Sequence, residues 1–143
     1  MSAWWLAGAA SAIGTWLLWS AWRSHRDFVR AEGTFRCRVR VRSASLRGFG
    51  ATWSRRARHA RWVHDVLVVR GGVLRPRLYH LPVHVAEGEL VELDPRRVRG
   101  LGSRPVSVRV LLDDQSAVEV ATAEANRTLL AGPFVVLAVS RLR

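Results

Sequence analysis

The sequence contains no lysine, only one cysteine and few acidic residues, and each shortage narrows what the protein can be. With Cys37 alone, no disulfide can form within the chain, so nothing requires an oxidising compartment. We expect this thiol to be buried and inert. Arginine supplies all 23 basic residues against 11 acidic ones, for a formal net charge of +12. A GC-rich genome favours arginine whatever the function, yet such a field also attracts phosphates of lipid headgroups or nucleic acid.

Signatures of catalysis and of bound metal are also missing. The sequence has no nucleophile elbow, phosphate loop or dinucleotide fingerprint. His80 and His84 have a spacing that suits a metal site on a helix, but Pro82 between them excludes a helix there. The pair Asp113-Asp114 falls in an expected turn, where solvation explains it. We therefore predict no enzyme, no cofactor and no metal site.

Charge is absent from the first part of the chain. Residues 3–22 give 20 uncharged positions, and a helix of that length spans about 30 Å, the thickness of the hydrocarbon core of a bilayer. Tryptophans lie towards both ends of this segment, as in an aromatic belt, at positions 4, 5, 16, 19 and 22. We predict a membrane anchor over residues 1–32, with its transmembrane span at 3–22.

A cleaved signal peptide is the rival interpretation of this segment. Only Met1 and Ser2 precede it, so there is no basic n-region, and Trp19 and Trp22 crowd the place of a small-x-small cleavage site. Arginines follow the span, so the positive-inside rule predicts a cytoplasmic domain over residues 33–143 in the cell membrane. Small residues four apart in the span would allow two helices to pack closely, but they leave the oligomeric state open.

The chain just after the span is strongly basic. From Arg23 to Arg61 there are 12 arginines against two acids, a local excess of 12 − 2 = 10. Residues 35–42 alternate strictly between apolar residues and arginine, which is the period of a half-buried strand. The predicted surface for anionic headgroups consists of Arg23, Arg26, Arg30, Arg36, Arg38, Arg40 and Arg42. Near an anionic leaflet each could add about 1 kcal/mol of attraction; the plain alternative is a solvated outer face.

The rest of the chain indicates short strands. Strands are predicted at 35–42, 51–58, 61–70, 73–81, 89–93, 105–112 and 117–121. Gly71-Gly72 and residues 113–116 are expected to form hairpin turns. Pro76 and Pro82 should confine the strand at 73–81 to an edge or break it.

A helix is expected at the C-terminal end. Thr122 would cap it, and Gly132-Pro133 would either kink or end it. Its expected buried stripe is Leu129, Leu130, Phe134 and Leu137. About seven strands followed by one helix predict an α+β, mostly β domain, a small PH-like barrel or bent sheet closed at one end by the helix.

Two tryptophans lie among the arginines of the basic region. Between Trp53 and Trp62 lie four arginines, at positions 55, 56, 58 and 61. Mixtures of this kind can stack the bases of single-stranded nucleic acid or rest on lipid. Core packing of both indoles ranks first, lipid contact second and nucleic acid third.

Short motifs along the chain resemble a known family. They are Gly33-Thr34-Phe35 with Cys37, Trp53, Ala57-Arg58, Trp62, Arg75-Pro76 and Glu119-Val120-Ala121. In this order they resemble the actinobacterial membrane proteins grouped as domain of unknown function 2550. The resemblance covers nearly the whole chain and implies an N-terminal span and no assigned activity. It also implies a bioenergetic or envelope setting, because members are often encoded near F-type ATP synthase genes.

Three functional hypotheses follow from these patterns. The first is a non-enzymatic binding or scaffold domain tethered to the membrane, which holds anionic lipid or an acidic protein partner. The alternative is an accessory subunit whose span and domain dock on a larger membrane complex. A nucleic-acid binder ranks last. Salt and lipid dependence would distinguish the three. Lipid binding should weaken with salt and need anionic headgroups, docking should survive salt and need the native span, and nucleic-acid binding should weaken with salt without any need for lipid.

Overall fold

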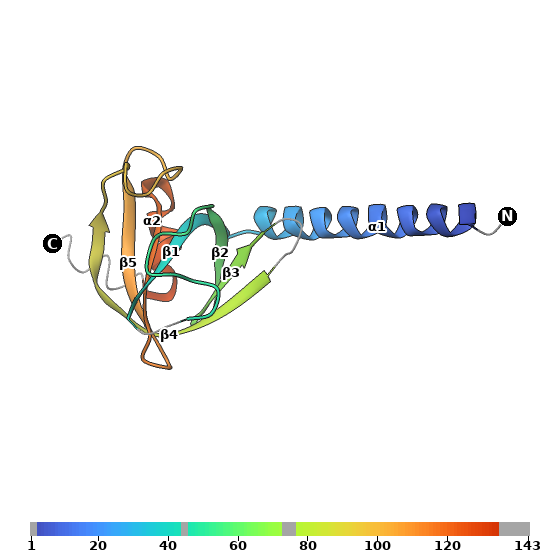
Figure 1. The fold of residues 1–143 in the computed structure, drawn as a ribbon. Helices are drawn as coiled ribbons and strands as arrows, with labels where there is room; N and C mark the ends of the chain where they lie inside the picture. Colours follow the sequence, from blue (N-terminus) through green and yellow to red (C-terminus); the bar gives the residue numbers. More distant parts are fainter. Residues whose placement is uncertain (1–2, 44–45, 73–76, 135–143) are drawn as a thin grey trace.

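The computed structural model describes residues 3–43, 46–72 and 77–134 of the chain, with the side chains of the first helix described from Gly8 onward. A long N-terminal helix, α1 (Ala3–Arg30), leads into a small β domain and projects away from it as a single rod (Figure 1). The domain is an antiparallel β-barrel followed by short helical turns. The expected mostly β architecture, with a helix at each end, is confirmed.

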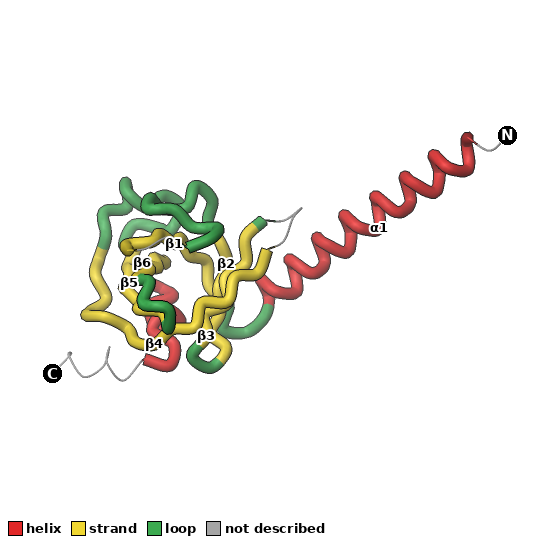
Figure 2. The backbone as a smooth tube through the Cα atoms, turned by 60° about the horizontal axis from the view of Figure 1, so that its bottom comes forward, coloured by secondary structure: helices red, strands yellow, loops and turns green. Residues whose placement is uncertain are grey.

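Six strands form the barrel in chain order, and the last pairs with the first. They are β1 (Phe35–Ser43), β2 (Arg58–Val63), β3 (Val66–Gly71), β4 (Arg77–Glu92), β5 (Pro105–Leu112) and β6 (Ala117–Ala123). Figure 2 looks into this closed ring of strands. Because β1 and β6 join, each of the six strands has a neighbouring strand on both sides, although β1 and β2 pair only over Phe35–Cys37 and Arg58–Ala60.

The core fills the inside of the ring with aliphatic side chains from the six strands. β1 shows how the sequence pattern produces this, because Phe35, Cys37, Val39 and Val41 point inward and are buried. β6 is covered on both faces. Its outer face at Ala121 is packed by Val98 and Leu101 from the loop between β4 and β5.

The prediction of seven strands was wrong in the middle of the chain. Residues 51–57 are a loop, and Arg58 is already the first residue of β2. The loop after β1 bonds to this strand at isolated points: Val41 N–H donates to Gly50 O, and Ser54 N–H donates to Val39 O. The predicted strand at 61–70 is two strands, because a turn at His64 and Asp65 folds it into a hairpin. His64 has a φ of 56°, a left-handed conformation that the periodicity does not reveal.

Pro82 does not make an edge strand of β4, and Pro76 lies outside the described residues. β4 pairs with β3 up to Pro82 and with β5 from Val83 onward, so Pro82 lies where the strand changes partner. A missing N–H at that point breaks neither ladder. The predicted strand at 89–93 is the end of this same long strand. The hairpin turn at 113–116 is confirmed, with β5 and β6 on either side of it.

Short helices close one end of the barrel. They are η1 (Glu124–Asn126), α2 (Arg127–Ala131) and η2 (Gly132–Phe134). Leu130 enters the core, and its carbonyl accepts a hydrogen bond of 3.2 Å from the indole Nε1 of Trp62. A Cβ on Gly132 would lie 2.3 Å from that indole ring, so only glycine fits there.

Three details of the predicted C-terminal helix need correction. Thr122 does not cap it, since its hydroxyl donates to the carbonyl of Arg36 at 2.6 Å instead. Leu129 is exposed rather than buried. α2 ends at Ala131, before Gly132-Pro133, so the helix is not continuous through that pair. Leu137 and the side chain of Phe134 lie outside the described residues.

The N-terminal helix covers the predicted anchor and its extension. α1 runs unbroken through 28 residues to Arg30, and Gly33 follows with a φ of 79°. By mean hydropathy, no helix in the described part of the chain is both long enough and apolar enough to cross a membrane. The transmembrane span at 3–22 therefore stays a prediction.

Candidate functional site: two basic surfaces of the barrel

The predicted basic strand is present, and its arginines point out of the barrel. The residues of β1 alternate as the sequence indicates, with the apolar ones buried. Arg36 and Arg42 are exposed, whereas Arg38 and Arg40 are half-buried. The two half-buried arginines are used by the fold itself.

Arg40 is neutralised by an acid 79 positions later in the chain. Its Nε donates to Glu119 Oε2 at 2.9 Å, and its Nη2 lies 2.8 Å from the same oxygen. The other carboxylate oxygen accepts a hydrogen bond of 3.1 Å from Ser107. The guanidinium also lies 4.4 Å from the ring centroid of Trp53. Glu119 is opposite Arg40 in the β1–β6 register, so this group ties the closing strands together.

Arg38 holds the loop that follows β1. One of its guanidinium nitrogens donates to the backbone carbonyls of Ser54 and Arg55, the latter at 2.7 Å. Burial, and then the nearby charge of Arg36, lower the pKa of Arg38. A Cβ on Gly100 would lie 3.6 Å from guanidinium nitrogens of both Arg36 and Arg38, so these two charges share one place beside the loop.

The arginines after the charge-free segment contact its tryptophans. The guanidinium carbon of Arg23 lies 5.1 Å from the ring centroid of Trp19, and that of Arg26 lies 5.3 Å from the centroid of Trp22. Arg30 is exposed at the end of α1. Cation–π contacts of this kind hold charge and indole together where the helix leaves its apolar part.

A second basic surface, which was not predicted from the sequence, lies where the last turns of α1 meet β2 and β3. We call it the joint, and it consists of His25, Phe28, His59, Arg61 and Arg70. Phe28 is buried beneath two guanidiniums, with the Arg61 carbon 5.1 Å and the Arg70 carbon 5.6 Å from its ring centroid. The rings of His25 and His59 meet edge to face, 5.6 Å apart.

Strand register creates the joint. Arg36 on β1 is opposite His59 on β2, and His59 is opposite Arg70 on β3. Three basic residues thus form one row across the outside of the barrel. Arg70 is only 5% exposed, and one of its nitrogens donates to Ser24 Oγ on α1 at 3.2 Å.

Unsatisfied buried nitrogens concentrate at the joint. In the described residues, six buried side-chain nitrogens have no hydrogen-bond partner, and four belong here: His25 Nδ1, Arg61 Nε, and Nε and Nη2 of Arg70. All 11 acidic residues lie in the described ranges, and no carboxylate among them forms an ion pair with the joint. Burying a guanidinium without a counter-ion costs free energy, and buried polar groups in folded proteins normally have a partner.

The joint is strongly positive, and its histidines respond to that field. Burial, and then the charge of Arg70, lower the pKa of His25. Burial, and then the charges of His25 and Arg36, lower the pKa of His59. Both imidazoles are therefore neutral near pH 7 when no anion is present.

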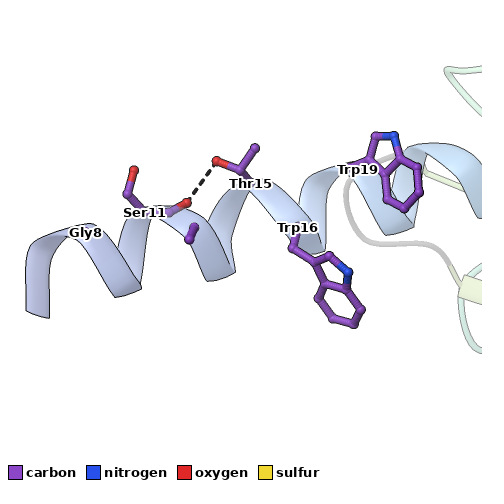
Figure 3. A pocket seen from close by; sticks show the side chains of 6 residues that line it. Gly8, Ser11, Thr15, Trp16 and Trp19 are labelled. Atoms are coloured by element: carbon purple, nitrogen blue, oxygen red, sulfur yellow. Dashed lines mark hydrogen bonds between the residues drawn. The ribbon is translucent and has the colours of Figure 1, made fainter. Parts of the chain in front are cut away.

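A shallow groove lies on the exposed surface of α1. Gly8, Ser11, Ala12 and Thr15 form its floor, and Trp16 and Trp19 stand beside it (Figure 3). Thr15 Oγ1 donates to the carbonyl of Ser11 at 2.9 Å, so its hydroxyl is satisfied within the helix. Small residues here leave the helix backbone accessible to close approach.

The remaining reactive groups have structural explanations. Burial raises the pKa of the Cys37 thiol to about 12, so it is inert, as expected. His84 lies 3.8 Å from Asp113, and both side chains are well exposed. Within the described ranges, no three His, Cys, Asp or Glu side chains come together as a metal site would require.

Both interleaved tryptophans belong to the fold. Trp62 packs against the barrel core and donates to α2, and Trp53 packs against Val98 and Leu101. This confirms the prediction that both indoles pack within the fold. Comparison with known proteins found no matching family model, no similar curated protein and no similar solved structure. The resemblance to domain of unknown function 2550 therefore stays a prediction.

Proposed function

We propose that the protein is a non-enzymatic binding module tethered to a membrane by α1, with the barrel on the cytoplasmic side. The observation that carries this proposal is the uncovered apolar surface of α1. Six large apolar side chains of this helix are at least half exposed: Ile13, Trp16, Leu17, Leu18, Trp19 and Trp22. The barrel covers none of them, because α1 projects away from it (Figure 1).

These side chains surround the helix rather than form a stripe. At about 100° per residue, positions 13, 17, 18, 22, 19 and 16 follow one another around the axis. A helix that is apolar all round belongs inside a protein or a membrane, whereas one that lies on a surface needs a polar face. Charge begins only at Arg23, where arginines and tryptophans meet, as at a headgroup boundary.

Membrane insertion can be tested with one charge. Leu17→Arg places a guanidinium in the middle of the apolar part of α1, which costs about 3 kcal/mol in a bilayer, or roughly a hundredfold in partitioning. We expect the full-length protein to stay in membranes after alkaline extraction and the variant to be released. Val91→Arg makes the same change at an exposed position of β4 and should have no effect. Release of the wild type with the variant would refute the anchor.

The basic face next to the anchor supports contact with anionic headgroups. Arg36 and Arg42 are its exposed members on β1. Arg42 Nε also lies 3.7 Å from Glu119 Oε2, whereas Arg38 and Arg40 are engaged more closely within the fold. The wild-type protein can be compared in vesicles with and without anionic lipid by chemical modification of the Arg36 side chain. We expect Arg36 to be protected only in anionic vesicles, and less so at high salt. Equal protection of Arg36 in neutral and anionic vesicles would contradict contact with anionic headgroups.

The groove on α1 favours a second candidate, an accessory subunit of a larger membrane complex. Its small residues would allow a partner helix to pack closely. Gly8→Leu fills the groove without adding charge, and it should abolish capture of a partner helix while leaving membrane extraction unchanged. Leu17→Ala changes an exposed residue on the opposite side of the helix from the groove and is the matched control.

A further inference from the structure

The joint has the composition of an anion site, and no carboxylate of the described residues forms an ion pair with it. Its members come from three elements: His25 and Phe28 from α1, His59 and Arg61 from β2, and Arg70 from β3. Arg36 of β1 borders it through the register with His59. The two acids nearest in sequence to His25 and Phe28 are Asp27 on α1 and Glu32 just after it; both are exposed and form no ion pair within the described residues.

We propose that the joint binds one phosphate group, on the two histidines and above the buried charge of Arg70. The proposal rests on the proposed anchoring, because His25 follows the last residue of the apolar segment by three positions, roughly 4.5 Å along the helix. That distance places the joint at the level of lipid headgroups. A headgroup phosphate and free phosphate share the same chemistry, and the experiment separates them.

Charge and accessibility support this site. Arg70 is nearly inaccessible, and its charge acts through the low-dielectric surroundings rather than by direct contact. His25, His59 and Arg61 are half-buried, and Arg36 is exposed, so they can reach a ligand at the rim. Imidazolium and guanidinium groups donate charge-assisted hydrogen bonds to phosphate oxygens.

Binding should change the protonation of the histidines. Partial burial of the two imidazoles lowers both pKa values, the charge of Arg70 adds to this for His25, and the charges of His25 and Arg36 add to it for His59. A bound phosphate offsets those charges and favours the protonated imidazoles, so the pKa of each histidine rises on binding. A phosphodiester has a fixed charge in this pH range, so its affinity should increase as the pH falls.

The test is an NMR titration of the histidine rings in the full chain, first in detergent without phosphate and then with inorganic phosphate. The same titration in lipid nanodiscs compares phosphatidylcholine alone with added phosphatidylglycerol. A rise in the pKa of His25 and His59 with inorganic phosphate identifies free phosphate as the ligand. A rise only with phosphatidylglycerol identifies the headgroup. If neither changes the two pKa values, the proposal is overturned.

Variants exclude a general effect of charge. Arg70→Met should weaken the response by about tenfold, because the central charge is gone. Arg109→Gln removes one exposed arginine on β5, across the barrel from β2, and should respond like the wild type. If Arg70→Met fails to fold, His59→Gln must still lower the response of His25. Failure to enter nanodiscs would speak against the anchor alone, since the detergent arm needs no bilayer.

Discussion

Two groups of arginines lie on the same barrel and differ in what surrounds them. On β1, Arg40 has a carboxylate at 2.8 Å, and one nitrogen of Arg38 donates to backbone carbonyls, although its Nε has no partner within the described residues. At the joint, Arg70 is more deeply buried than either, yet two of its nitrogens have no partner within the described residues. The first group stabilises the fold as it stands, whereas the second is left with uncompensated charge.

This difference changes which arginines matter for function. A stripe of four equivalent arginines on β1 is what the sequence suggests, but two of them are committed to closing the barrel and holding a loop. Uncompensated charge attracts a ligand, and compensated charge does not. The functional surface therefore shifts from the centre of β1 towards its exposed ends and the joint.

The largest expected effect comes from turning the compensated site into an uncompensated one. Glu119→Gln leaves the half-buried Arg40 without its carboxylate, and we expect a loss of about 2–3 kcal/mol in the free energy of unfolding. Chemical denaturation of the full chain in detergent measures this loss. Glu92→Gln breaks the exposed pair with Arg104 and is the matched control, with no measurable change expected. Equal effects from both variants would show that burial does not distinguish these pairs.

A smaller effect is expected from removing the ring that covers the joint. Phe28→Ala removes both cation–π contacts, so the last turns of α1 should open more easily, by about 2 kcal/mol. Hydrogen exchange of the amides from Ser24 to Ala31 measures this opening. Val63→Ala at an exposed position of β2 should leave those amides protected. Unchanged exchange in Phe28→Ala would mean that α1 does not dock through this ring.

The smallest effect is the response of the joint to pH without phosphate. The pKa values of His25 and His59 lie below their ordinary value of 6.5 in the folded chain. Below pH 6.5 the unfolded chain therefore binds more protons, so stability rises with pH in this window and is lost on acidification. Unfolding midpoints between about pH 7.5 and pH 5.5 should fall in the wild type and fall less in His59→Gln. A midpoint that rises on acidification would contradict the assignment.

Local periodicity accounts for much of the fold. The strict alternation of residues 35–42 predicted β1 and the burial of Cys37, and the acidic turn at 113–116 predicted the last hairpin. Residues 51–57 were predicted as part of a strand, but they form a loop near β1 with only isolated hydrogen bonds to it. Long-range register, rather than local pattern, decided that segment.

The partners of the arginines could not be predicted from local pattern. Glu119 is the only charged residue in β6, which is a signal that it has a partner, but nothing local names Arg40. The joint is harder still, since His59 and Arg70 become neighbours only through the β2–β3 register. A single chain shows periodicity within a strand and not which residues face each other across strands.

The most direct test of the comparison is to replace Arg40 and Arg70 separately by methionine and measure unfolding in anion-poor buffer. Arg40→Met leaves the carboxylate of Glu119 without its main partner and should destabilise the barrel. Arg70→Met removes a charge that has no counter-ion and keeps an apolar contact with Phe28, so stability should be unchanged or raised. A loss of stability in Arg70→Met as large as that in Arg40→Met would contradict the account, because both arginines would then be compensated.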